Sequence, residues 1–124
     1  KTGDPNPAEW EGERPDAPQL PLYAATHDGR LAAIAFARLA VGECGFRGLG
    51  EDSGIPGVKA APGGSLAALT GEWTQTLERL AREFQEGYAA VTPKSRKSCE
   101  YCTLPAFCRI ADAGIRSDCG GGDE

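Results

Sequence analysis

Three of the five cysteines lie close together near the C-terminal end of the chain. Cys99 and Cys102 are separated by two residues, and Cys108 follows after five more. A short turn can bring both sulfurs of such a pair to one point, where thiolates bind a metal ion or an iron–sulfur cluster. Three thiolates do not complete a tetrahedral site, so a fourth ligand must come from Cys44, from Cys119 or from outside this chain. Three interpretations follow: reduced cysteines in a small helical segment, a zinc site completed by Cys119, or a [4Fe–4S] cluster with a distant fourth cysteine.

A second group of candidate residues lies near the start of the chain. Lys1 precedes Thr-Gly, and Gln19 and Tyr23 are four residues apart, so in a helix they would share one face. A lysine, an amide and a phenol can together orient water and phosphate oxygens. Taken from these residues alone, the simplest interpretation is a solvated Lys1 and a Tyr23 packed in a core with Gln19 at its edge.

Composition limits the classes of function. The chain has 124 residues, a net charge of −5 and 40% hydrophobic residues, which suits one domain or part of one. The acidic balance argues against a whole-chain electrostatic footprint for nucleic acid, so any DNA contact needs a local basic patch or a bound metal ion. An odd number of cysteines with a single histidine, His27, indicates thiol metal chemistry in a reducing, cytoplasmic compartment. No apolar run approaches the length of about 18 residues that a membrane span requires.

A loop and a short helix would position Lys1, Gln19 and Tyr23, the candidate residues near the start of the chain. Residues 1–18 contain four prolines and two glycines and are predicted to form a loop with an exposed Trp10. A short helix is predicted over residues 17–27, with Asp16 as its N-cap and Pro21 tolerated in its first turn.

Residues 30–40 are ambiguous, because their alanines favour a helix while their alternation favours a strand. The Asp-Gly before and Gly42 after support the strand, which would be buried on both faces. A second short strand is predicted near residues 44–49, followed by a loop to Gly64. Residues 65–91 form the segment with the clearest helical pattern. A long amphipathic helix is predicted there, with Ser65 as its N-cap and its end near Gly87. Its apolar stripe comprises Leu66, Leu69, Trp73, Leu77, Leu80, Ala81, Phe84 and Tyr88.

The tail differs in composition from the rest of the chain. Pro93 blocks further helix, and a cysteine-rich tail is predicted over residues 93–119, with residues 120–124 disordered. Its basic side chains are candidates for contact with a DNA backbone, although a solvated charge run explains them as well. They are Lys94, Arg96, Lys97 and Arg109.

Taken in order, these segments resemble one known family. The order is Lys-Thr-Gly, a loop with "WEGERP", "PQLPLYA", a strand, a long helix ending "REFQEGYAAVTP", and "CEYCTLPAFCR". It is similar to the C-terminal part of a RecB-type nuclease domain of the PD-(D/E)XK superfamily, in its AddB-like iron–sulfur branch. The resemblance extends from Lys1 to about Ile110. The resemblance implies an α/β fold that is part of a restriction-endonuclease-like (PD-(D/E)XK) fold and begins at its catalytic lysine. Residues 1–92 would form the C-terminal portion of the nuclease core.

The resemblance also implies roles. Lys1 matches the lysine of the acid-x-lysine motif, Gln19 and Tyr23 match the Q-x3-Y motif, and the cysteines at 99, 102 and 108 match the last three cluster ligands. The Mg²⁺-binding acids and the first cluster cysteine would lie upstream of Lys1, in a longer protein. The expected function is therefore Mg²⁺-dependent DNA exonuclease activity in DNA repair, within a protein that works with a helicase or a helicase–nuclease partner subunit.

For the 124-residue chain itself, the resemblance predicts no activity. An exposed sheet edge beside the strand at 30–40 could pair with a second copy, so the chain could dimerise. The alternatives are a nuclease-like scaffold that binds DNA without cutting it and an independent zinc-knuckle domain.

Overall fold

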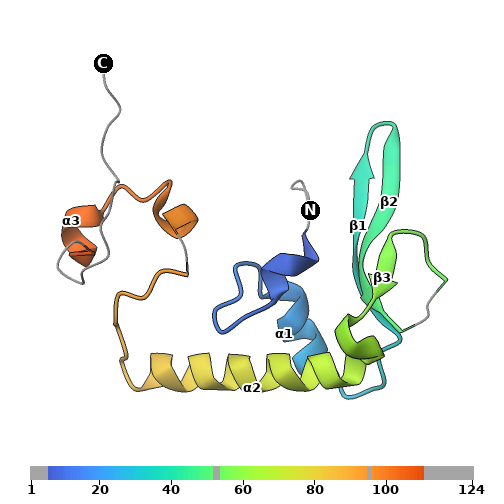
Figure 1. Ribbon diagram of the computed structural model, residues 1–124, viewed down its shortest axis with the longest axis horizontal. Coiled ribbons are helices and arrows are strands. Elements are labelled where there is room, and N and C mark those ends of the chain that lie inside the picture. The colour runs from blue at the N-terminus through green and yellow to red at the C-terminus, as the bar shows by residue number, and fades with distance from the viewer. Residues whose placement is uncertain (1–5, 52–53, 95, 111–124) are drawn as a thin grey trace. The chain divides into compact units, whose positions relative to one another are not determined.

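The computed structural model describes residues 6–51, 54–94 and 96–110 (Figure 1). The chain divides into two compact units, residues 1–83 and 84–124, and each is considered by itself. The described elements are η1 (Pro7–Trp10), α1 (Gln19–Ala25), β1 (Ala33–Ala40), β2 (Glu43–Gly50), β3 (Val58–Ala60), η2 (Pro62–Gly64), α2 (Leu66–Gln85), η3 (Arg96–Cys99) and α3 (Pro105–Cys108). The predicted disordered end, residues 120–124, lies outside the described residues.

A three-stranded sheet with helices beside it makes the first unit α/β, as predicted. β1 and β2 form an antiparallel hairpin in which Ala33 pairs with Gly50 and Ala40 with Glu43. Gly42, with φ +83°, occupies the left-handed conformation that the tight turn between the two strands requires. The strand interpretation of residues 30–40 is therefore confirmed over the helical one.

β3 is the element that sequence reasoning missed. It pairs in parallel with the end of β2, with Gly48 beside Val58 and Gly50 beside Ala60. The segment between Gly50 and Gly64, predicted to be a loop, thus contains a third strand and the short helix η2. Three residues between glycines and prolines are too few to show a clear alternation, so the sequence gives little signal for this strand.

The two faces of the hairpin differ in burial. Ile34 and Phe36, on one face of β1, pack against the hydrophobic core. Leu39 points to the other face and is 82% exposed. The expected burial of this strand on both faces is therefore wrong at its turn end, because the core extends only along the part of the hairpin nearer to Leu49.

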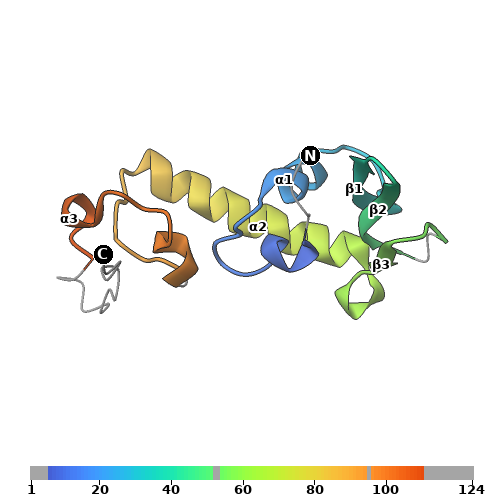
Figure 2. The ribbon, with the colours of Figure 1, turned by 90° about the horizontal axis from the view of Figure 1, so that it is seen from above.

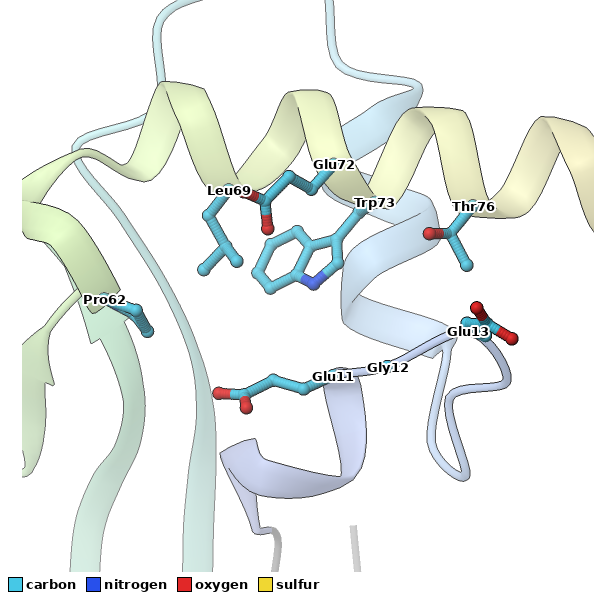
Figure 3. A pocket seen from close by; sticks show the side chains of 8 residues that line it. All are labelled: Glu11, Gly12, Glu13, Pro62, Leu69, Glu72, Trp73 and Thr76. Carbon is cyan, nitrogen blue, oxygen red and sulfur yellow. The ribbon is translucent and has the colours of Figure 1, made fainter. Parts of the chain in front are cut away.

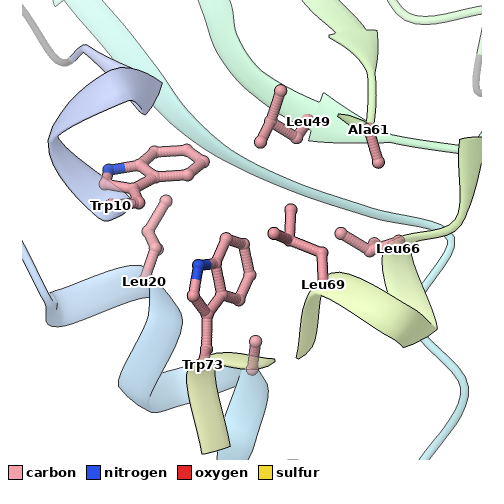
Figure 4. Close-up of a cluster of buried hydrophobic side chains, with 8 residues drawn as sticks. Trp10, Leu20, Leu49, Ala61, Leu66, Leu69 and Trp73 are labelled. Atoms are coloured by element: carbon pink, nitrogen blue, oxygen red, sulfur yellow. The ribbon is translucent and has the colours of Figure 1, made fainter. Parts of the chain in front are cut away.

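Trp10 lies at the centre of the core, contrary to the exposed position predicted for it. Its side chain is fully buried and makes edge-on contacts with Phe36 and Trp73, with ring centroids 6.1 and 6.2 Å apart. Figure 4 shows Trp10 and Trp73 within the buried cluster. A proline-rich segment thus contributes one of the two tryptophans of the core. The buried cluster comprises Trp10, Leu20, Ala24, Leu49, Ala61, Leu66, Leu69 and Trp73.

The long helix α2 begins as predicted. The Ser65 hydroxyl accepts a hydrogen bond from the backbone N–H of Ala68 at 3.2 Å, which is the N-cap contact expected for serine. The helix ends at Gln85, and Gly87 follows with φ +73°, the conformation common just past a helix.

Only the first half of the predicted apolar stripe on α2 is buried. Leu66, Leu69 and Trp73 belong to the core, and Figures 1 and 2 show η1, α1 and the sheet gathered beside this half of the helix. Phe84, near the other end, is 86% exposed. Within the described residues, no helix combines the length and the apolar composition needed to cross a membrane.

Candidate functional site

Gln19 and Tyr23 come together on α1, as their spacing predicts. The side-chain amide Nε2 of Gln19 donates a hydrogen bond to the phenolic oxygen of Tyr23 at 3.3 Å. Both residues are exposed, and Tyr23 retains 56% of its accessible surface. This face of α1 therefore presents an amide carbonyl and a phenol to solvent, where they can hydrogen-bond to water or to a phosphate oxygen.

The opposite face of α1 fixes the helix to the core. Leu20, Pro21 and Ala24 are buried. Pro21 is the third residue of the helix, where a backbone N–H would have no partner within the helix, so the missing donor costs nothing. The N-cap is Pro18 rather than the predicted Asp16, and no side chain caps the helix. Core packing, rather than capping, therefore holds this short helix in place.

Ion pairs attach the segment before α1 to helix α2. Arg14 contacts Glu83 at 2.9 Å, and Glu83 also contacts Arg79 at 2.5 Å. A guanidinium nitrogen of Arg79 donates to the backbone carbonyl of Glu13 at 2.6 Å. Together with the contact between Trp10 and Trp73, this network fixes the segment that leads into α1.

Sequence reasoning missed this positioning network. Its signal was present, because the segment "WEGERP" contains both the buried tryptophan and the paired Arg14. The partners Arg79 and Glu83 lie on α2 and are more than 60 residues away in the chain. Spacing along the sequence could not identify them. Lys1, the first of the predicted catalytic residues, lies outside the described residues.

The cysteine segment forms a turn followed by the single-turn helix α3. The backbone N–H of Cys102 donates to the carbonyl of Cys99 at 3.0 Å, so the C-x2-C pair spans a turn as predicted. The N–H of Leu104 donates to the sulfur of Cys102 at 3.5 Å, a type of contact that stabilises a thiolate.

Thiol chemistry fits a metal or a cluster, but the arrangement of the described residues does not complete a site. No disulfide joins any two of Cys44, Cys99, Cys102 and Cys108. In residues 6–51, 54–94 and 96–110, no three Cys, His, Asp or Glu side chains are arranged to hold a metal ion. Cys119, the candidate fourth zinc ligand, lies outside these residues.

The four basic candidates occupy the second unit. Lys94 precedes η3 and is exposed, whereas Arg96 and Lys97 lie within η3. Arg109 follows α3, is exposed, and has φ +53°. The structure thus places all four within a segment of 16 residues on either side of the cysteines.

In the first unit, Arg30 pairs with Glu51 at 2.8 Å, near the open end of the hairpin. The hydrogen bond and the negative charge of Glu51 raise the pKa of Arg30, so this guanidinium stays protonated. It serves to join the ends of the hairpin, since the backbone N–H of Glu51 also donates to Ala32.

Comparison with known proteins gives one match. The family model described as the PD-(D/E)XK nuclease superfamily matches residues 1–109. No curated protein and no solved structure matches the chain. The matched range contains Lys1, the Gln19–Tyr23 pair and the three clustered cysteines, and the α/β architecture of the first unit is consistent with part of the fold of that superfamily.

Proposed function

This chain belongs to the PD-(D/E)XK nuclease superfamily, whose members are typically nucleases, and we propose that it forms part of a DNA exonuclease of the RecB type. The observation that carries the proposal is the family match over residues 1–109. The hydrogen-bonded, exposed pair of Gln19 and Tyr23 supports it, because these residues stand at the spacing of the Q-x3-Y motif. DNA is the substrate that the superfamily implies.

In this proposal, three side chains act on the phosphodiester. The Lys1 ammonium stabilises the negative charge that develops on the phosphate and orients the attacking water. The Gln19 amide hydrogen-bonds to that water or to the DNA backbone. Tyr23 holds Gln19 in place through the hydroxyl that accepts the Gln19 N–H at 3.3 Å. Mg²⁺, when bound, supplies Lewis acidity and lowers the pKa of water.

We propose that the 124 residues alone do not cleave DNA. The resemblance assigns the Mg²⁺ ligands to two acidic residues on the N-terminal side of the motif lysine, and residues 1–124 do not include them. Asp4, Glu9, Glu11 and Glu13 follow the lysine and do not replace them. In this proposal, activity belongs to a nuclease core that combines those acids with residues 1–92, and residues 93–119 form a cysteine tail.

The cysteine tail is proposed to be structural. Cys99, Cys102 and Cys108 would supply three ligands of a [4Fe–4S] cluster, with the fourth cysteine upstream. Such a cluster would join the tail to a distant segment and so reduce the entropy cost of closing a long loop. Lys94, Arg96, Lys97 and Arg109 would then lie beside the DNA backbone. Cysteine ligands of this kind suit a reducing compartment such as the cytoplasm.

The proposal includes association of two copies through the edge of the sheet. The strand order β1-β2-β3 leaves β1 at one edge of the described sheet, where a second copy could add by backbone hydrogen bonds. Sedimentation of the chain over a range of concentrations tests this directly, and a monomer at all concentrations would exclude it. A helicase partner rests on the family resemblance alone.

The experiment that tests the proposed roles compares two glutamine variants in the longer protein. Gln19→Ala should slow Mg²⁺-dependent degradation of linear DNA by about 10- to 100-fold, because it removes a group that positions the reacting atoms. The matched control is Gln75→Ala, an exposed glutamine on α2, which should cut at the wild-type rate. Equal rates for both variants would remove Gln19 from the site, and DNA binding without cleavage by the wild type would indicate a scaffold.

A further inference from the structure

The cysteine segment exposes three large apolar side chains within a short stretch of chain. Tyr101 is 88% exposed, Phe107 is 89% exposed, and Leu104 between them is 61% exposed. A single exposed apolar residue is common on a protein surface, but phenylalanine is more often buried, and exposed apolar residues that occur together mark an interaction surface. This stretch of the second unit is therefore a candidate binding surface.

Backbone hydrogen bonds place these side chains along the segment. The N–H of Cys102 closes the turn that contains Tyr101 by donating to the carbonyl of Cys99 at 3.0 Å. The N–H of Phe107, in α3, donates to the carbonyl of Leu104 at 3.1 Å, so residues 104 and 107 are neighbours on one helical turn. Phe107 comes six positions after Tyr101, so their Cα atoms are at most about 22 Å apart. A few nucleotides of one strand can span that distance.

The same segment is positively charged, although the chain is acidic. Residues 94–110 contain four basic residues and one acidic residue, Glu100, which gives a net charge of +3. The whole chain has a net charge of −5, so the rest of the chain carries −8. A local excess of positive charge attracts a phosphate backbone, even where single side chains also contact other residues of the chain.

A groove in the first unit has the opposite charge. It lies between α2 and the segment after η1, and its lining includes Glu11, Glu13 and Glu72 (Figure 3). Among the described residues that line it there is no Lys or Arg. These carboxylates repel phosphates, so the groove does not suit a nucleic acid. Positive charge and exposed aromatic rings occur together in residues 94–110.

We propose that residues 94–110 bind single-stranded DNA, with unpaired bases stacked on the rings of Tyr101 and Phe107. Every base has an aromatic face, so stacking of this kind requires no particular sequence. The positive charge of the segment attracts the phosphates, and Leu104 adds an apolar contact between the two rings. The inference rests on the proposed function for the choice of DNA, and it adds the residues that receive the bases.

Duplex DNA fits this surface less well than a single strand. Its phosphates would be attracted in the same way, but its bases are paired and stacked on one another. Reaching Tyr101 or Phe107 would require a base to leave the stack, which costs free energy. Binding should therefore depend on unpaired bases as well as on phosphates.

The test measures binding of the 124-residue chain to three fluorescein-labelled oligonucleotides by fluorescence anisotropy, without added Mg²⁺. The first is a single strand of about 15 thymidines, the second an abasic strand with the same phosphates, and the third a duplex of the same length. The thymidine strand should bind with a Kd of about 10 μM, a value typical of non-specific binding. The abasic strand and the duplex should bind about 10-fold more weakly or worse, because neither offers unpaired bases.

Variants of the two aromatic residues locate the site. Tyr101→Ala and Phe107→Ala should each weaken binding of the thymidine strand by about 10-fold, which is the loss of one stacked base. Tyr101→Phe keeps the ring and should bind like the wild type. The matched control is Phe84→Ala, because Phe84 is 86% exposed but lies outside residues 94–110, and this variant should bind like the wild type. All three side chains are exposed, so folding is retained.

Three results would overturn the proposal. Equal binding of the thymidine and abasic strands would show attraction by charge without stacking. Equal losses in Phe84→Ala and Phe107→Ala would show that the aromatic residues of the segment have no special role, and no binding of the thymidine strand would remove the site. Because no Mg²⁺ is added, these outcomes are separate from cleavage, and Lys1-dependent degradation of DNA by the longer protein would still support the proposed nuclease.

Discussion

Trp10 offers the most demanding test of the described core. It is fully buried and contacts both Phe36 and Trp73 edge-on. Trp10→Ala removes the whole side chain and both ring contacts, so the free energy of unfolding should fall by about 3–5 kcal/mol. Since a domain of this size is stable by about 5–15 kcal/mol, this variant should be largely unfolded under mild denaturing conditions.

Trp10→Phe should behave quite differently. Phenylalanine keeps an aromatic ring for both edge contacts, and it removes an indole N–H that has no partner among the described residues. Burying an unsatisfied donor costs about 1–3 kcal/mol, and relief of that cost offsets much of the lost packing. We therefore expect a loss of about 1 kcal/mol or less.

Urea denaturation followed by circular dichroism measures both changes, with Phe84→Ala as control. Phe84 is 86% exposed, so its removal should change stability by less than about 0.5 kcal/mol. The reasoning is refuted if Trp10→Ala costs no more than Phe84→Ala, because Trp10 would then lie outside the core. A cost for Trp10→Phe equal to that for alanine would show that the indole N–H has a partner.

Two further predictions concern the ion-pair network and the cysteines. Glu83→Gln removes the shared partner of Arg14 and Arg79, which are partly exposed, so stability should fall by about 1 kcal/mol, and by less at high salt. Glu78→Gln, on the same helix, should be nearly neutral, and equal losses would contradict a specific network. For the cysteines, iron and sulfide analysis of the longer protein should show a cluster that is lost in Cys99→Ser, Cys102→Ser or Cys108→Ser and kept in Cys119→Ser. A zinc ion bound by the 124-residue chain and lost on Cys119→Ser would establish the zinc site instead.

The elements that sequence reasoning predicted correctly are those specified by local signals. Ser65 caps α2 because its hydroxyl reaches an N–H three residues ahead, and the hairpin is bounded by the turn at Gly42. Gln19 and Tyr23 meet because residues four apart in a helix are neighbours, a fact that needs no tertiary structure.

Besides the missed strand β3 and the N-cap of α1, the errors concern burial, which depends on distant residues. Trp10 sits in a proline-rich segment that looks like an exposed loop, and only the packing of Phe36 and Trp73 around it reveals its position in the core. The exposed Leu39 and Phe84 show the converse, because an apolar pattern does not say how far the core extends. The pairing of Arg14 with Glu83 joins residues 69 positions apart, beyond the reach of any pattern in the sequence.

The role of Lys1 is the most direct test of the proposed function. The measurement is Mg²⁺-dependent degradation of linear DNA by the longer protein, comparing the wild type with Lys1→Ala and with the control Lys59→Ala, an exposed lysine on β3. The proposal predicts that the wild type and Lys59→Ala degrade DNA at the same rate, whereas Lys1→Ala is slower by about 100-fold or more while staying folded. Equal rates for all three proteins, or no cleavage by any of them, would contradict a catalytic role for this region.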